Sequence, residues 1–162
     1  MVKKIYYTWQ DVEKMCVNIV TQMYKDNWKP DYIVGITRGG NVPATIISNM
    51  TGIRCEALKV SLRDDDKGET RTDMSRDAFL DRKKILIVDD INDTGSTFEW
   101  IQNDWKSSMN TGENPWGDTV RFAVLTENLS SKFDGVSYHC DEVNKAEEDC
   151  WLVYPWENVG EY

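Results

Sequence analysis

The chain has 162 residues, of which 40% are hydrophobic and 29% are charged, and its net charge at pH 7 is −9. This length suits a single domain, residues 1–162, with a core that buries roughly 70% of the surface of the unfolded chain. The negative charge and the lack of a dense basic cluster argue against a nucleic-acid-binding surface, and no apolar run approaches the ~20 residues of a membrane helix. Four cysteines without a Cys-x-x-Cys pair indicate reduced thiols in a cytoplasmic protein.

Helices and strands alternate along most of the chain. Thr8 and Asp11 form a variant of the capping box, and the apolar residues after them recur with helical spacing over about five turns. Short apolar runs then predict strands at 31–36, 55–60, 84–88 and 119–125, with helices at 42–50 and 96–106 between them. Such alternation predicts an α/β fold, with a central, mostly parallel sheet and helices on both faces.

Residues 61–82, SLRDDDKGETRTDMSRDAFLDR, do not show a sustained helix or strand period. A loop of this length within a compact domain is usually either a functional lid or disordered. Its acidic run, residues 64–66, predicts a solvated loop tip rather than a metal site.

The sequence ILIVDDINDTGST, residues 85–97, puts two carboxylates, Asp89 and Asp90, at the end of a buried strand. Ligands of open parallel sheets collect at the carboxyl ends of the strands. The small and hydroxyl residues that follow are Thr94, Gly95, Ser96 and Thr97. Backbone N–H groups at a helix start bind phosphate, and carboxylates accept hydrogen bonds from sugar hydroxyls, directly or through Mg²⁺. The pattern therefore predicts a site for a ribose 5-phosphate.

This stretch resembles the phosphoribosyl pyrophosphate (PRPP) motif of the type I phosphoribosyltransferases. IVGITRGGNVPA, residues 33–44, resembles the pyrophosphate-binding loop of the bacterial xanthine-guanine phosphoribosyltransferase branch, which often contains a cis peptide. CWLVYPWE, residues 150–157, is similar to the segment of that branch that covers the purine, and the early YYTWQDVEK also matches. The resemblance implies the family's fold, in which the central, mostly parallel sheet has five strands and a small C-terminal hood for base recognition lies at residues 126–162.

The resemblance also implies where PRPP lies. Asp89 and Asp90 would hold the ribose hydroxyls and Mg²⁺, and residues 93–97 would hold the 5-phosphate. The backbone of four residues would hold pyrophosphate: Thr37, Arg38, Gly39 and Gly40. Residues 61–82 would be a mobile lid, because the oxocarbenium-like state of ribosyl transfer must be kept from water.

On the base side, the resemblance implies that Asp93 faces the purine N7 as acid/base partner, while Trp151 stacks on the base beside Leu152. Purine members usually place a lysine after the strand that follows the PRPP helix, where it meets the 6-oxo group. Here AVLTEN, residues 123–128, puts Thr126 at that place, and Lys132 is the nearest lysine. A 6-oxopurine is the first choice of base, and another base stays open.

Two functions are compatible with these residues. The first is a Mg²⁺-dependent phosphoribosyltransferase of purine salvage, making a nucleoside 5-monophosphate and pyrophosphate from PRPP and guanine, xanthine or hypoxanthine. The second is a non-catalytic sensor of PRPP or a nucleotide on the same fold. The intact acidic pair and phosphate loop favour the enzyme. Relatives are commonly dimers or tetramers, so a homo-oligomer is expected, and the single histidine, His139, is interpreted as structural or exposed.

Overall fold

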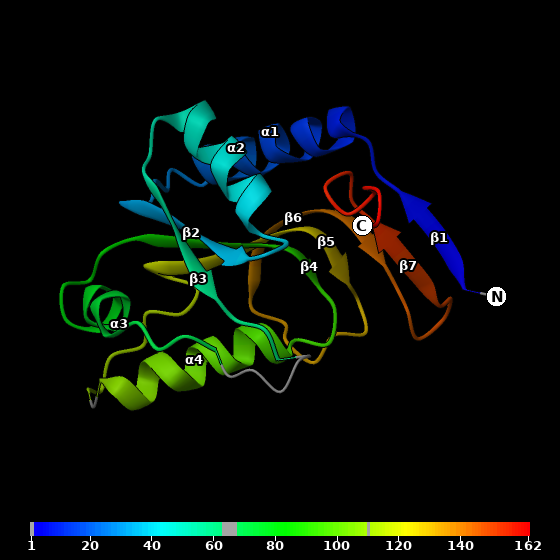
Figure 1. Ribbon diagram of the computed structural model, residues 1–162. Helices are drawn as coiled ribbons and strands as arrows, with labels where there is room; N and C mark the ends of the chain where they lie inside the picture. Colours follow the sequence, from blue (N-terminus) through cyan, green and yellow to red (C-terminus); the bar gives the residue numbers. More distant parts are fainter. Residues whose placement is uncertain (1, 63–67, 110) are drawn as a thin grey trace.

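A computed structural model describes residues 2–62, 68–109 and 111–162 of the chain (Figure 1). In chain order the elements are β1 (Lys3–Tyr6), α1 (Trp9–Lys25), β2 (Tyr32–Thr37), α2 (Asn41–Thr51), β3 (Cys55–Lys59), α3 (Thr72–Phe79), β4 (Ile85–Asn92), α4 (Ser96–Ser108), β5 (Val120–Asn128), β6 (Val136–Val143) and β7 (Cys150–Val153). The acidic run at residues 64–66 lies outside the described residues.

Five of these strands form one parallel sheet in the order β3-β2-β4-β5-β6. Helices α1 and α2 cover one face of this sheet, and α3 and α4 cover the other (Figure 1). The expected fold class is therefore confirmed. β4 is the middle strand, so its carboxyl end lies between the ends of β2 and β5, where ligands of parallel sheets bind.

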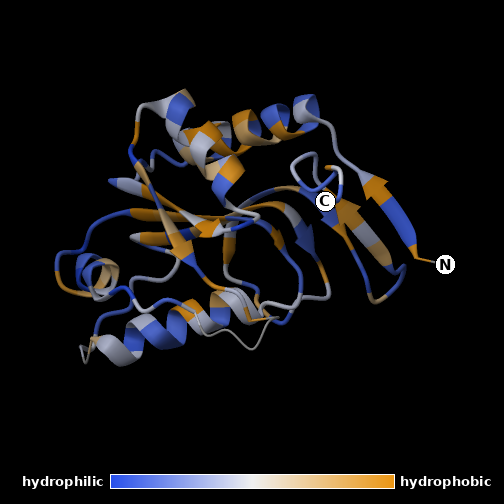
Figure 2. Cartoon of the chain, viewed as in Figure 1, coloured by the Kyte–Doolittle hydropathy of each residue, from blue (hydrophilic) through white to orange (hydrophobic). Residues whose placement is uncertain are grey.

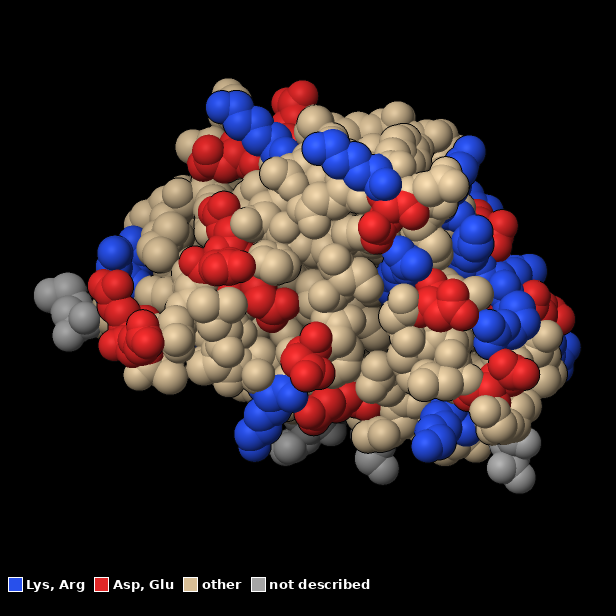
Figure 3. Space-filling view, turned by 180° about the vertical axis from the view of Figure 1, so that it is seen from behind, with Lys and Arg blue, Asp and Glu red and all other residues tan. Residues whose placement is uncertain are grey.

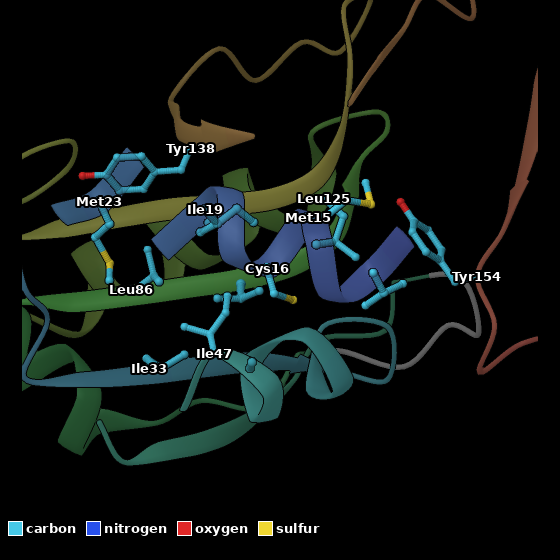
Figure 4. Packing of buried hydrophobic residues seen from close by; sticks show 14 of the residues in the cluster. Met15, Cys16, Ile19, Met23, Ile33, Ile47, Leu86, Leu125, Tyr138 and Tyr154 are labelled. Atoms are coloured by element: carbon cyan, nitrogen blue, oxygen red, sulfur yellow. The ribbon is translucent and has the colours of Figure 1, made fainter. Parts of the chain in front are cut away.

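The apolar stripe predicted for the first helix is buried against the sheet. Thr8 caps α1 with the expected capping box, in which its side chain and that of Asp11 each accept a backbone N–H. Figure 4 shows Met15, Ile19 and Met23 of α1 among residues of the sheet and of α2, and these three side chains are at most 6% exposed. A second buried cluster fills the space between the other face of the sheet and helices α3 and α4. Figure 2 shows the matching pattern, with hydrophobic residues concentrated along the central strands.

A two-stranded parallel sheet of β1 and β7 stands beside the main sheet and forms the hood (Figure 1). The sequence analysis did not predict a strand at residues 3–6, because that segment is polar and only Ile5 is clearly apolar and strand-forming. The predicted hood boundary also differs, since residues 126–128 complete β5 and residues 136–143 form the edge strand β6. The hood is thus built from both ends of the chain.

The prediction of a continuous loop at residues 61–82 is wrong for its second half. Residues 72–79 form α3, which buries Met74, Ala78 and Phe79 against the core. This helix is too short, and too polar on its outer side, to produce a recognisable period in the sequence. Just before this helix, Gly68 packs on the ring of Trp100. A lid movement around this segment stays a prediction.

Charged side chains of both signs share the surface. On the face shown in Figure 3, lysine and arginine side chains are interspersed with aspartate and glutamate. Among the described residues, none of the helices has both the length and the apolar character needed to cross a membrane.

Candidate active site

The acidic pair lies at the carboxyl end of β4, half-buried between the ends of the neighbouring strands. The carboxylate of Asp89 accepts a hydrogen bond from the backbone N–H of Asp90 at 2.9 Å, and the carboxylate of Asp90 accepts one from the N–H of Ile91 at 2.8 Å. These local bonds limit the rotation of both side chains. The two carboxylates are therefore held at the sheet edge where the sequence predicted them.

The glycine turn after β2 packs directly on this strand end. A methyl group added at Gly39 would overlap the carboxylate of Asp90, with Oδ1 only 2.9 Å away. A methyl group at Gly40 would overlap the carbonyl oxygen of Val88 and lie 3.0 Å from Cα of Asp89. The peptide bond between Thr37 and Arg38 at the start of this turn is cis. The predicted pyrophosphate loop and the predicted ribose-binding pair are thus in contact, although about 50 residues separate them.

The expected phosphate cradle is the start of α4. Gly95 is its N-cap with φ of +92°, a conformation that favours glycine, and a methyl group there would lie 2.7 Å from Cβ of Phe133. As a glycine, the N-cap residue has no side chain that could accept from the first-turn N–H groups of the helix. The Ser96 N–H donates instead to Thr94 Oγ1, at 3.3 Å. The hydroxyl groups of Thr94 and Ser96 lie 3.0 Å apart. A helix start with backbone N–H groups and hydroxyls suits an anion.

Asp93 lies between this cradle and the hood. The side-chain amide of Asn128, at the end of β5, donates to the backbone oxygen of Asp93 at 2.8 Å and to its Oδ1 at 3.3 Å. Nζ of Lys145 lies 3.2 Å from the same Oδ1. Neither partner is recognisable from the sequence, since they are 35 and 52 residues from Asp93 and neither belongs to a motif. The carboxylate of Asp93 is therefore held in one orientation by groups from two other segments.

The hood presents one aromatic ring toward these residues. Trp151 is 48% exposed, and Nζ of Lys145 lies 6.0 Å from the centre of its ring. Leu152, the next residue of β7, is 7% exposed and packs into the core, so only its backbone is available to a ligand. Lys145 thus pairs with the predicted acid/base residue, Asp93, and lies near the predicted base-stacking residue, Trp151.

The side chain of Thr126 does not line this space, so a contact of this residue with the base, which stays a prediction, would have to use its backbone. It is fully buried, and its hydroxyl bonds the hydroxyls of Tyr154 at 2.9 Å and Tyr7 at 3.2 Å. Tyr154 also donates to the backbone oxygen of Asp90 at 2.9 Å. Burial raises the pKa of Tyr7 to about 12 and that of Tyr154 well above its ordinary value. Both phenols therefore stay protonated; Tyr7 ties the hood to β5, and Tyr154 ties it to the ends of β4 and β5.

The residues of the site fit a magnesium ion only in part. Within the described residues there is not a cluster of three or more His, Cys, Asp and Glu side chains that would hold a metal alone. The adjacent carboxylates of Asp89 and Asp90 are nevertheless the donor set that Mg²⁺ uses when water and substrate phosphates supply its other ligands. The donors thus fit a Mg²⁺ ion that arrives with a polyphosphate substrate.

The phosphoribosyl transferase domain family matches residues 3–154, and the chain belongs to this family. The hypoxanthine-guanine phosphoribosyltransferase of Schizosaccharomyces pombe is 24% identical over 184 positions, which cover 95% of this chain and 89% of that protein. The xanthine-guanine phosphoribosyltransferase of Idiomarina loihiensis is 23% identical, with 96% and 88% covered. A solved xanthine-guanine-hypoxanthine phosphoribosyltransferase of Helicobacter pylori has a TM-score of 0.72 at 20% identity, with 96% and 94% covered.

These matches confirm the resemblance to the type I phosphoribosyltransferases and their bacterial xanthine-guanine branch. They also confirm the expected class of enzyme, a transferase of phosphoribosyl groups. The relatives above are all named for purine bases, which supports nucleobase transfer as the coarse reaction class.

Proposed function

We propose that this protein transfers the 5-phosphoribosyl group of PRPP to a 6-oxopurine, with Mg²⁺, and releases a nucleoside 5-monophosphate and pyrophosphate in purine salvage. The observation that carries the proposal is the contact between the glycine turn and the acidic pair, with Gly39 against Asp90. Because of this contact, backbone amides that would bind pyrophosphate lie next to carboxylates that would bind the ribose. These two groups of PRPP are neighbours in the substrate.

The parts of PRPP would be held by three neighbouring segments. The 5-phosphate would lie on the first-turn N–H groups and hydroxyls of α4, where the helix dipole favours an anion. The 2- and 3-hydroxyls of the ribose would donate to Asp89 and Asp90. Pyrophosphate would lie on the turn at residues 37–40, whose Arg38 side chain is exposed and adds a positive charge.

The reaction forms a bond between C1 of the ribose and N9 of the purine and breaks the bond from C1 to pyrophosphate. As N9 attacks, the proton on N7 must leave, and the carboxylate of Asp93 would accept it. Trp151 would cover one face of the base, holding N9 in line with C1 and keeping water away. The amides of the glycine turn would stabilise the charge that develops on the departing pyrophosphate.

Bound Mg²⁺ would neutralise part of the pyrophosphate charge and add a Lewis acid to its oxygens. Asp89 and Asp90 are the residues that would hold it. Part of residues 61–82 would close over the bound substrate as a lid.

Four free cysteines, Cys16, Cys55, Cys140 and Cys150, support a location in the reducing cytoplasm. Assembly into a homo-oligomer is part of the same proposal.

The test is the double variant Asp89→Asn with Asp90→Asn, measured by pyrophosphate release from PRPP with Mg²⁺ and a panel of bases. We expect kcat/KM to fall by at least a hundredfold with little change in Tm, because neither carboxylate packs in the core. The matched control is Glu113→Gln with Asp118→Asn, which changes charge equally but only affects exposed ion pairs with Arg82.

Near-normal turnover by the double variant would contradict the assignment of the acidic pair. A wild-type protein that binds PRPP, measured by calorimetry, but releases no pyrophosphate with any base would instead support the non-catalytic sensor. Turnover with a pyrimidine alone would overturn the choice of purine and leave the reaction class intact.

A further inference from the structure

The base side of the site contains a cation that sequence reasoning did not single out. Lys145 lies in the loop between β6 and β7, and its side chain is only 18% exposed. Its Nζ contacts the carboxylate of Asp93 at 3.2 Å and lies 6.0 Å from the ring centre of Trp151. A lysine this well covered is held by its neighbours, whereas most surface lysines extend into water.

The backbone of Lys145 is fixed by the same residue that fixes Asp93. Its N–H donates to the side-chain oxygen of Asn128 at 3.0 Å, while the amide nitrogen of Asn128 donates to the backbone oxygen of Asp93 at 2.8 Å. Asn128 is 5% exposed, and its oxygen also accepts from the hydroxyl of Ser130 at 2.9 Å. One buried amide therefore sets the distance between the acid and the cation.

This pairing matches the edge of one class of base. In guanine and hypoxanthine, N7 and O6 are neighbouring groups on the same edge of the ring, and lysine or arginine is the usual side chain that reads them. If N7 faces Asp93, the 6-substituent lies beside it, on the side where a cation 3.2 Å from Asp93 can reach. An ammonium has three N–H donors, so it can bond Asp93 and a carbonyl oxygen at the same time.

We propose that Lys145 is the specificity residue of this enzyme and donates to the 6-oxo group of the purine that is stacked on Trp151. This inference rests on the proposed function and adds the residue that chooses the base. It also assigns the role to the loop between β6 and β7, because Thr126 at the end of β5 is buried and bonded to two tyrosines.

Lys132 was the other lysine considered from the sequence. It is exposed, and its backbone N–H donates to the carbonyl of Thr94 at 3.2 Å, on the phosphate side of the site. Lys145 is instead partly buried, is paired with Asp93 and lies 6.0 Å from the ring centre of Trp151, the two residues assigned to the base. Lys132 therefore provides a matched control, with the same side chain at the edge of the same site.

The experiment compares product nucleotides, so that its readout does not need turnover. GMP and 2-aminopurine riboside 5-monophosphate share the ribose phosphate, N7 and the 2-amino group, but only GMP has a 6-oxo group. Their dissociation constants are measured for the wild type and for the Lys145→Met, Lys145→Arg and Lys132→Met variants. Tm and circular dichroism are recorded for each protein to show that it is folded.

We expect Lys145→Met to weaken GMP on the order of tenfold to a hundredfold, the range of a lost charge-assisted hydrogen bond. The 2-aminopurine nucleotide should change by less than about threefold, Lys145→Arg should keep most of the preference for GMP, and Lys132→Met should leave the ratio of the two dissociation constants unchanged. Equal weakening of both nucleotides by Lys145→Met would mean that the lysine only orients Asp93, and would overturn the inference. If Lys145→Met keeps the wild-type preference for GMP over the 2-aminopurine nucleotide, the inference is also overturned, while the proposed function stays intact. If the wild type binds neither nucleotide, both the inference and the proposed function fail.

Discussion

The substitution Gly40→Ala tests the contact on which the proposed site depends. Gly40 has φ of −84°, a conformation that alanine also adopts, so the backbone itself does not oppose the change. The obstacle is space. The new methyl group would overlap the carbonyl oxygen of Val88 and would lie 2.8 Å from the nitrogen of Ile36 and 3.0 Å from Cα of Asp89. All three are backbone atoms, which cannot rotate away as a side chain can.

The size of the effect follows from these distances. Ordinary non-bonded contacts lie at about 3.5–4.0 Å, so the turn must withdraw from β4 by on the order of 1 Å. Forcing extra atoms into a packed region costs about 1–3 kcal/mol of folding free energy. For a domain of this size that corresponds to a Tm lower by about 2–4 °C per kcal/mol. A misplacement of about 1 Å within a site can reduce the rate on the order of a hundredfold.

The assay is pyrophosphate release at a temperature well below both melting transitions, together with inhibition by added pyrophosphate. We expect kcat/KM to fall on the order of a hundredfold and the inhibition constant for pyrophosphate to rise. The control is Gly112→Ala, because a methyl group at Gly112 would not meet any atom within 4 Å. If Gly40→Ala retains kcat/KM within about twofold of the wild type, the turn does not position pyrophosphate as argued.

Two further predictions concern the hood and the strand ends. Tyr154→Phe removes the hydroxyl that donates to the carbonyl of Asp90 and contacts Thr126. It should destabilise the protein by about 1–3 kcal/mol, seen as a lower urea midpoint, because two buried polar groups lose a partner. Burial raises the pKa of Glu127 above its ordinary value, so over the pH range between the two values the folded state keeps a proton that the unfolded state has released, and this contribution lowers stability as pH rises. The substitution Glu127→Gln removes the titrating carboxyl group but keeps an oxygen that accepts the hydrogen bond from Asn92. The difference in Tm between this variant and the wild type should therefore rise, in favour of the variant, from pH 4 to pH 7.

Each of these predictions has a direct check. Tyr6→Phe alters an exposed tyrosine and should leave the urea midpoint unchanged, so an equal shift in both tyrosine variants would contradict the role of the buried hydroxyl. For Glu127→Gln, a difference in Tm that is constant across the pH range would show that burial of this carboxyl does not affect stability.

The sequence by itself determined the fold class and indicated the residues proposed to bind PRPP, because these features are local. Helical period, apolar strands and the order of small and acidic residues are all written in consecutive positions, so Asp89, Asp90 and the start of α4 could be recognised from one stretch. The turn at residues 37–40 was recognisable for the same reason. In a parallel sheet, the carboxyl ends of neighbouring strands meet at one edge, which explains why the two motifs come together.

Only the tertiary structure decided the base side. Strand β1 forms because it finds β7 nearly 150 residues away, and the short helix α3 is fixed by packing on the core rather than by its own period. Thr126 is buried, and its hydroxyl is hydrogen-bonded to the hydroxyls of Tyr7 and Tyr154. Lys145 reaches Asp93 because the side chain of Asn128 is hydrogen-bonded to the backbone of both residues. Such contacts join residues far apart in the chain, and a linear pattern does not record which side chains will meet.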